Sequence, residues 1–284
     1  MVYCIWQEGN ENREEKKYDM MNGEKGDITM YQYVTMQWIL FFYIYCFIGW
    51  VWESCYETVR YHKWVNRGFM HGPFLPIYGF GAISMLLVSI PVRENLILVF
   101  LFGMIAATVL EYFTGTVMER LFHVRYWDYS KEFLNLNGHI CLKCSIAWGF
   151  FSILLVRIIH LRVEKLVFLI PEQMEHIVTV VLTLIIVSDF TVSFYEAMDL
   201  RRLLDSLLAG NEELLKLHEQ LEGIAALMNE DKELIKAAFD DRLDHLNKRT
   251  YKLVESILKR NPGAASRRHK QTLQQIREQI KERL

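Results

Sequence analysis

Three carboxylic acids lie within stretches of the sequence that are otherwise apolar. Glu53 ends the run WILFFYIYCFIGWVWE, Glu111 lies in ATVLEYFTGTV, and Asp189 lies in IIVSDFTVSFY. A charged side chain at the centre of a bilayer costs about 2.5–3.5 kcal/mol, so such a group normally faces the interior of a helix bundle. The acids could pair with Arg67 or Arg120 to hold the helices together, or they could form a site for a substrate or an ion. We favour the site.

Two polar loops follow the first two of these acids along the chain. The first loop leads into NRGFMHGPFLPIYGFG (66–81), whose prolines and glycines interrupt helical hydrogen bonding. Interrupted helices are tolerated in membranes where the freed backbone lines a cavity, and they recur at the substrate sites of transporters. The second loop, HVRYWDYSKEFLNLNGHICLKCS (123–145), is rich in aromatic, amide and charged side chains. The predicted substrate or pathway residues are Glu53, Arg67, Tyr78, Glu111, Asp128, Asn137 and His139, with Asp189 as a secondary candidate.

Glu53 and Glu111 also belong to a weak internal repeat. Each acid is followed at the same spacing by Thr-Val, then by a glycine-containing loop, and then by an aromatic-Gly-Phe triplet, YGF (78–80) or WGF (148–150). This pattern predicts that the first and second pairs of helices are parallel copies of one hairpin. The two loops differ in length, so a chance match is the alternative.

Other residue types that could do chemistry are weaker candidates. Cys141 and Cys144 form a CxxC motif, but a zinc site needs about four ligands and the sequence contains no second pair. Packing of small side chains is therefore favoured over metal binding or redox chemistry. We expect no metal, no cofactor and no nucleic-acid partner. The aromatic residues expected at the membrane interface are Trp50, Trp52, Trp64, Trp127 and Tyr129.

Five apolar stretches of bilayer-spanning length position these residues. The average composition hides them, because 52% hydrophobic residues and a net charge of -2 are ordinary for a soluble protein. A helix needs about 20 mostly apolar residues to cross the hydrocarbon core. The sequence therefore predicts an all-α, polytopic protein of the lipid bilayer. Its expected spans are roughly 38–59, 73–92, 96–118, 141–160 and 177–195.

The chain is expected to have three parts. Residues 1–35 are predicted to be a disordered tail, because they are charged and show no hydrophobic periodicity. Residues 36–196 form the predicted transmembrane domain, and residues 197–284 form a charged helical region. Within 198–260, two runs of apolar residues at heptad spacing predict two helices, in a hairpin or coiled coil that self-associates or binds a partner.

The distribution of basic residues predicts the orientation. Lys and Arg favour the cytoplasmic side of a membrane when they lie in short loops or near the ends of spans. The face with the loops 60–72 and 119–140 and the C-terminal tail carries eight such residues, against four on the other face. We therefore expect a multi-pass protein of the plasma membrane with a cytoplasmic C-terminus.

Several of these segments resemble one bacterial family, the CmpB-like type IV ABC-transporter permeases. The resemblance covers about residues 36–195 and rests on FIGWVWES, NRGFMHGPFLPIYGFG, ATVLEYFTG, YWDYS and LNLNGHICL. It implies the membrane subunit of a transporter. Because the chain lacks a GxxxxGK[ST] phosphate loop, ATP hydrolysis would come from a separate ATPase subunit. Family members usually have Arg where this chain has His139 and often Asn where it has Cys144, so a titratable group replaces a fixed cation at the first position.

Three functions are compatible with these features. The favoured one is a permease-like membrane subunit with Glu53, Glu111 and Arg67 in its pathway, and enzymatic activity is not expected. The second is a membrane-embedded enzyme for a lipid-linked substrate, in which paired carboxylates with Asp128 and His139 do acid–base work, although no nucleophile is evident. The third is a scaffold or signalling protein that acts through its coiled C-terminal region.

Overall fold

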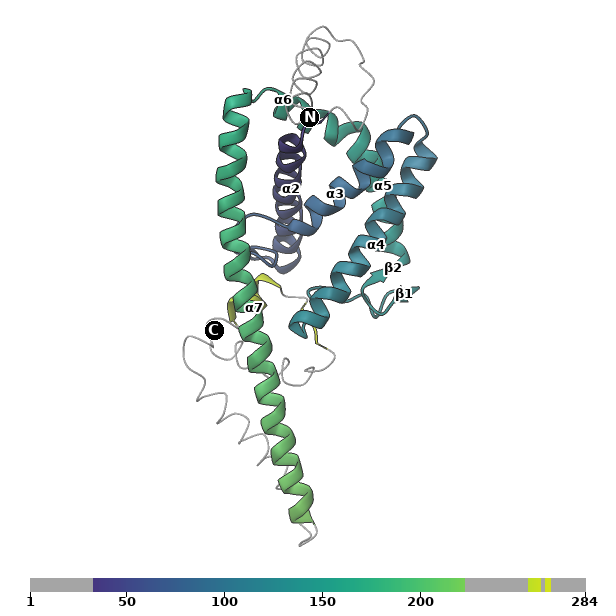
Figure 1. Ribbon diagram of the computed structural model, residues 1–284. Helices are drawn as coiled ribbons and strands as arrows, with labels where there is room; N and C mark the ends of the chain where they lie inside the picture. Colours follow the sequence, from purple (N-terminus) through teal and green to yellow (C-terminus); the bar gives the residue numbers. More distant parts are fainter. Residues whose placement is uncertain (1–32, 223–254, 262–263, 267–284) are drawn as a thin grey trace, which may run out of the picture. The chain divides into compact units, whose positions relative to one another are not determined.

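Figure 1 shows the computed structural model of the chain. The structure describes residues 33–222, 255–261 and 264–266. The predicted N-terminal tail lies outside this part of the chain except for residues 33–35. Most of the described residues are helical, which confirms the prediction of a mostly helical fold.

Helices follow one another along the chain, with long connections at residues 62–75 and 123–141. In chain order they are α2 (Thr35–Tyr61), α3 (Pro76–Ser89) with the 3₁₀ turn η2 (Ile90–Val92), α4 (Leu96–Phe122), α5 (Leu142–Leu154) with the π-helical turn η3 (Leu155–Ile159), α6 (His160–Phe168) and α7 (Glu172–Glu222). Two short strands, β1 (Asn135–Leu136) and β2 (Ile140–Cys141), form an antiparallel hairpin directly before α5. Because α5, η3 and α6 follow without a break, they form one continuous helical stretch.

In the part of the chain that the structure describes, four helical stretches are long and apolar enough to cross a membrane. They are Thr35–Tyr61, Leu96–Phe122, Leu142–Phe168 and Glu172–Arg202. The sequence predicted five spans. The predicted span 73–92 corresponds to a shorter apolar helix, Pro76–Val92. This helix begins later than predicted because the backbone at Leu75 is extended and Pro76 starts the first turn, a position where the missing N–H of proline has no cost.

The outer surfaces of these helices are apolar. Ile97, Val109, Phe113 and Leu184 are each more than 60% exposed. Large apolar side chains exposed in such number mark contact with a membrane or with another protein. Together with the lengths of the helices, it identifies an integral membrane protein.

The chain divides into two compact units, which we describe separately. Unit 1 comprises Met1–Thr114 and Tyr129–Phe190, and unit 2 comprises Gly115–Asp128 and Thr191–Leu284. In unit 1, α2 packs against α3 and α6, and α3 packs against α5. Phe41 and Leu86 are fully buried in this core. The core therefore lies between helices that the sequence predicted to be separate spans.

Glycines let the helices of unit 1 approach one another closely at two equivalent positions. A Cβ atom at Gly79 of α3 would lie 2.5 Å from Cys46 Sγ and 2.7 Å from a ring carbon of Phe42 in α2. A Cβ atom at Gly149 of α5 would lie 2.5 Å from a ring carbon of Phe100 in α4. Because real Cβ atoms do not come so close to other atoms, any larger residue at either position would force the neighbouring side chains or the helices to move.

The loop after α2, residues 62–75, runs back along the helix that precedes it. The backbone N–H of Arg67 donates to Ser54 Oγ (3.1 Å), and the backbone N–H of Leu75 donates to the carbonyl oxygen of Cys46 (3.0 Å). Cys46 lies about 22 Å before the end of α2 at a rise of 1.5 Å per residue. The chain therefore returns as irregular backbone to the middle of a membrane-length helix before α3 begins.

In unit 2, the chain after α4 is tied to a short segment of the C-terminal region. Arg125 and Ala265 form an antiparallel β-bridge with N···O distances of 2.6 and 2.9 Å. Ser266 Oγ donates to the carbonyl oxygen of His123 (2.7 Å), and His123 Nδ1 lies 3.1 Å from Asp205 Oδ1 of α7. Three segments that are distant in sequence are thus joined by backbone and side-chain bonds.

The last predicted span and the start of the predicted C-terminal region form one helix, α7, which runs without interruption from Glu172 to Glu222. Residues 255–260 are also helical. The rest of the predicted helical pair, residues 223–254, lies outside the described part of the chain.

Candidate functional site

Glu53 of α2 is held by one side chain from the next helix and one from the loop between them. The hydroxyl of Tyr78, in the first turn of α3, donates to Glu53 Oε1 at 2.6 Å. Arg67 Nε lies 3.5 Å from Glu53 Oε2. The Glu53 carboxylate therefore has one neutral hydrogen-bond donor and one cation beside it.

Glu111 of α4 is held in a similar way but by neutral groups. Tyr129 Oη donates to Glu111 Oε1 at 3.2 Å, and Trp148 Nε1 of α5 donates to Glu111 Oε2 at 3.0 Å. Burial, followed by the nearby Glu111 carboxylate, raises the pKa of Tyr129 well above its usual range, so the Tyr129 hydroxyl stays protonated and can donate. Glu111 itself is only 6% exposed.

The two acids belong to one continuous cluster because their aromatic partners touch. The rings of Tyr78 and Trp148 meet edge to face, with centroids 5.8 Å apart and planes at 65°, an arrangement that aromatic pairs favour. We call this cluster the paired-carboxylate centre. Its members are Glu53, Arg67, Tyr78, Glu111, Tyr129 and Trp148.

The contacts around the centre repeat between the hairpins α2–α3 and α4–α5. Each acid accepts a hydrogen bond from the aromatic residue of the aromatic-Gly-Phe triplet in the following helix. The Phe of each triplet packs against a phenylalanine of the preceding helix: Phe42 against Phe80 at 4.8 Å, and Phe100 against Phe150 at 5.1 Å between centroids. Phe42 precedes Glu53 by the same number of residues as Phe100 precedes Glu111. These matched contacts support the predicted repeat and make a chance match a poor explanation.

Asp189 of α7 binds a different part of the first loop. Asp189 Oδ2 accepts from the backbone N–H of Gly72 at 2.8 Å, and Oδ1 accepts from the backbone N–H of His71 at 3.1 Å. The ring nitrogen His71 Nδ1 lies 3.3 Å from Oδ1. This acid therefore satisfies backbone groups of the returning loop, a role that explains its presence in an apolar helix without a substrate.

Asn137 and His139 lie in and beside the turn that joins β1 to β2. Asn137 and Gly138 both have positive φ, 53° and 69°, a conformation that asparagine and glycine adopt readily. Asn137 Nδ2 donates to the hydroxyl of Tyr112 at 3.2 Å, and the buried His139 ring packs edge to face on Tyr112 at 5.8 Å. Since Tyr112 follows Glu111 directly, the turn lies beside the centre, although its contacts there are with Tyr112.

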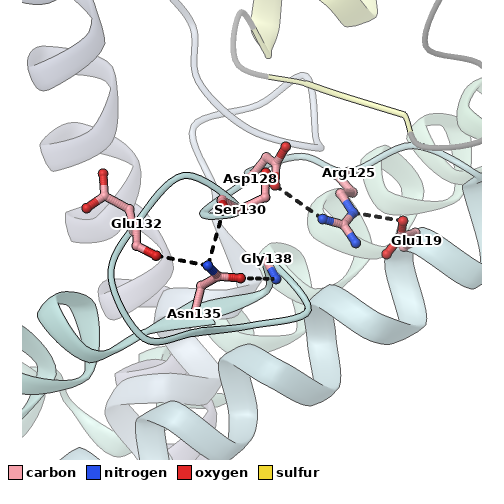
Figure 2. Close-up of polar contacts among 7 residues, drawn as sticks. All are labelled: Glu119, Arg125, Asp128, Ser130, Glu132, Asn135 and Gly138. Atoms are coloured by element: carbon pink, nitrogen blue, oxygen red, sulfur yellow. Dashed lines mark hydrogen bonds and ion pairs between the residues drawn. The ribbon is translucent and has the colours of Figure 1, made fainter.

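Two sets of polar contacts in the second loop region are drawn in Figure 2, and each belongs to its own unit. In unit 1, Asn135 Nδ2 donates to the carbonyl oxygens of Ser130 (3.3 Å) and Glu132 (2.9 Å), while Asn135 Oδ1 accepts from the N–H of Gly138 (3.1 Å). One amide side chain thus closes the loop that carries Tyr129, which explains how an irregular segment can place a hydroxyl on Glu111.

Asp128 belongs to the other set. In unit 2, Arg125 Nη1 lies 3.2 Å from Asp128 Oδ1, and Arg125 Nε donates to Glu119 Oε1 at 2.7 Å (Figure 2). Burial acts against the charge of Arg125, but its hydrogen bonds with Glu119 and the charges of Glu119 and Asp128 outweigh it and raise the pKa of Arg125. Asp128 therefore serves as a counter-ion of Arg125, which argues against its predicted role in substrate binding.

The sequence did not single out a second buried polar cluster in unit 1. The hydroxyl of Tyr33 donates to Glu164 Oε1 at 2.7 Å and lies 3.1 Å from His160 Nε2, while the hydroxyl of Tyr45 lies 2.7 Å from His160 Nδ1. All four residues are buried. His160 and Glu164 are one helical turn apart in the amphipathic helix α6, and this i, i+4 spacing was the available signal.

Tyr129 and Trp148 were also missed as members of the site. Tyr129 resembled an interfacial aromatic, and Trp148 entered the sequence argument only as part of a repeated triplet. The signal that could have found Trp148 is the repeat itself, because Tyr78 in the matching position was a predicted site residue. Among the described residues, no group of three or more His, Cys, Asp or Glu side chains is arranged to hold a metal ion.

The fold and the centre define a class: a helical integral membrane protein with a polar centre between its spans. The family model described as "Putative ABC-transporter type IV" matches residues 40–194, which is more than half of the chain. The chain belongs to this family, as its sequence motifs indicated. No curated protein and no solved structure matches the chain.

Proposed function

We propose that the protein is the membrane-embedded permease subunit of an ABC-type transporter and that the paired-carboxylate centre lies on the route of the transported solute. The observation that carries this proposal is the position of the two acids. They come from equivalent hairpins and are joined through Tyr78 and Trp148. Membrane folds built from repeats commonly place their substrate site at the repeat interface.

The energetics of burial support a functional role for the centre. Carboxylates inside a membrane protein are costly unless they are paired, hydrogen-bonded or wet. Helix association alone could use apolar packing at lower cost. The irregular loop that returns to the middle of α2 adds a second feature of solute pathways, because exposed backbone is tolerated at membrane depth where it is covered by protein or lines a cavity.

The proposed arrangement in the membrane has five crossings and a cytoplasmic C-terminus. The apolar helix Pro76–Val92 would provide the remaining crossing, and the charged C-terminal region would pair as a coiled coil with itself or with a partner on the cytoplasmic face of the plasma membrane. A separate ATPase subunit would supply the energy, because the chain has no phosphate loop of its own.

Co-purification and ATP hydrolysis test the proposed function. The tagged chain is purified from membranes of the source organism, its partners are identified by mass spectrometry, and the complex is reconstituted in lipid vesicles. We expect an ATPase with a phosphate loop in stoichiometric amount, and Glu111→Gln should change the rate of ATP hydrolysis severalfold. Phe113→Leu, on the exposed surface of the same helix, is the control and should leave the rate unchanged.

Two results would contradict the permease proposal. One is purification with enzymes of lipid or envelope synthesis and without an ATPase, which would favour the membrane-enzyme alternative. The other is an ATPase whose hydrolysis rate is the same with Glu111→Gln as with the wild-type chain. A reporter fused after Leu284 separately tests the orientation, because a reporter that is active only in the cytoplasm should be active there.

A further inference from the structure

We propose that Cys141 and Cys144 form a reversible intramolecular disulfide and thus a redox-modification site at the start of α5. Their sulfur atoms lie 3.0 Å apart. Both cysteines are free thiols in this structure. The sequence alone favoured simple packing for this pair, but packing does not require two sulfur atoms in direct contact.

The local fold brings the two thiols together. Cys141 is the N-cap residue of α5, with extended backbone, and its sulfur accepts a hydrogen bond from the backbone N–H of Cys144 at 3.4 Å. This bond directs the Cys141 side chain toward the first turn of the helix, where Cys144 lies. A disulfide bond is about 2.05 Å long, so about 1 Å of movement is needed, and rotation of the side chains can supply it.

The difference in exposure between the two cysteines decides which thiol reacts first. Cys141 is 1% exposed, whereas Cys144 is of intermediate exposure. An external oxidant of the disulfide class, such as glutathione disulfide, therefore reaches Cys144 first. Cys141 is then the resolving cysteine, already within contact distance of the sulfur it must attack.

The steps balance as thiol–disulfide exchange. The Cys144 thiolate attacks one sulfur of glutathione disulfide, a mixed disulfide forms, and one glutathione thiolate leaves. The Cys141 thiolate then attacks the Cys144 sulfur, the intramolecular bond forms, and the second glutathione thiolate leaves. The two cysteines lose two electrons to the oxidant, and the two thiol protons end on two molecules of glutathione.

The test is a redox titration of the purified full-length protein. The protein is equilibrated with mixtures of reduced glutathione and glutathione disulfide, and differential alkylation with peptide mass spectrometry reports each cysteine. We expect Cys141 and Cys144 to lose their reactivity together, at a glutathione disulfide concentration about 100-fold below that which modifies Cys144 in the Cys141→Ser variant, because the second thiol acts at a high effective concentration.

One variant sharpens the test. Cys141→Ser removes the resolving thiol, so Cys144 should accumulate a mixed disulfide with glutathione that the wild-type chain does not.

The proposal is overturned if Cys141 and Cys144 are modified independently, or if the wild-type chain accumulates the same mixed disulfide as Cys141→Ser. All of these outcomes are read from the cysteines alone, so they are independent of the proposed transport function.

Discussion

The hairpins α2–α3 and α4–α5 hold equivalent acids with different charge. Glu53 receives a hydrogen bond from Tyr78 and faces the guanidinium of Arg67. Glu111 occupies the matching position, but its hydrogen bonds among the described residues come from the neutral donors Tyr129 and Trp148. Two equivalent hairpins thus carry one ion-paired acid and one acid that, within the described part of the chain, is hydrogen-bonded by neutral donors.

The difference bears on the proposed roles of the two acids. An ion pair in a poorly solvated place resists the loss of either partner, because the remaining charge is left without compensation. A carboxylate held by neutral donors has no such constraint, and a positively charged or protonating ligand would improve its electrostatics. We therefore propose that Glu53 chiefly fixes the helices and that Glu111 chiefly contacts the ligand.

The largest expected effect is a loss of stability, and it should be similar for the two hairpins. Gly79→Ala and Gly149→Ala each place a Cβ atom 2.5 Å from a neighbouring side-chain atom, so each should destabilise the protein by about 1–3 kcal/mol through overpacking. Gly81→Ala is the matched control, since its Cβ would meet Leu110 at an ordinary 3.8 Å. Thermal unfolding in detergent measures the effects. If Gly79→Ala and Gly149→Ala were as stable as Gly81→Ala, the close helix contacts would be wrong.

The next largest effect is a difference in stability between variants of Glu53 and variants of Glu111. Glu53→Gln leaves Arg67 without its carboxylate and should cost about 1–2 kcal/mol, less than a fully buried pair because both side chains are partly exposed. Glu111→Gln should be neutral or slightly stabilising, because the amide can accept from Trp148 and donate to Tyr129 while a buried charge is removed. Thermal unfolding of both variants tests this contrast. Equal losses of stability would mean that Glu111 also has a charged partner and that the comparison fails.

A smaller effect concerns the hydroxyl donors. Tyr78→Phe and Tyr129→Phe each delete one hydrogen bond to a carboxylate and should cost about 1–2 kcal/mol. In double-mutant cycles, Tyr78→Phe should couple to Glu53→Gln, and Tyr129→Phe should couple to Glu111→Gln. Coupling of each tyrosine to the acid of the other hairpin would show that the two halves are not separate repeats.

The smallest expected effect is in the β1–β2 turn. Asn137→Ala and Asn137→Gly both remove the hydrogen bond to Tyr112, but only alanine is strained at a positive φ of 53°, so Asn137→Ala should be about 1 kcal/mol less stable than Asn137→Gly. The measurement is again thermal unfolding, together with the ATP hydrolysis rate of the reconstituted complex. If Asn137→Gly had normal stability but lost ATP hydrolysis, Asn137 would again be a candidate for ligand binding.

Much of the fold could be predicted because the controlling features are local in sequence. The length of an apolar run decides whether a helix can cross a bilayer, since the hydrocarbon thickness is constant. Four of the five predicted spans are full-length helices, and Pro76 accounts for the later start of the remaining one. The acids and the aromatic-Gly-Phe triplets could also be recognised in the sequence. Such residues are unusual in apolar runs, so they can be identified without knowledge of their partners.

The partners of those acids were decided by tertiary structure. Trp148 lies 37 residues from Glu111 along the chain, and Tyr129 reaches Glu111 only because Asn135 closes its loop. Asp189 and Asp128 were candidate site residues because of their charge and their place in the sequence. In the structure, Asp189 binds the backbone of the first loop and Asp128 neutralises Arg125. The contact between Cys141 and Cys144 likewise depends on where α5 begins. Hydrogen bonds and ion pairs act over a few ångströms, so the packing of helices selects among many polar residues that the sequence makes equally eligible.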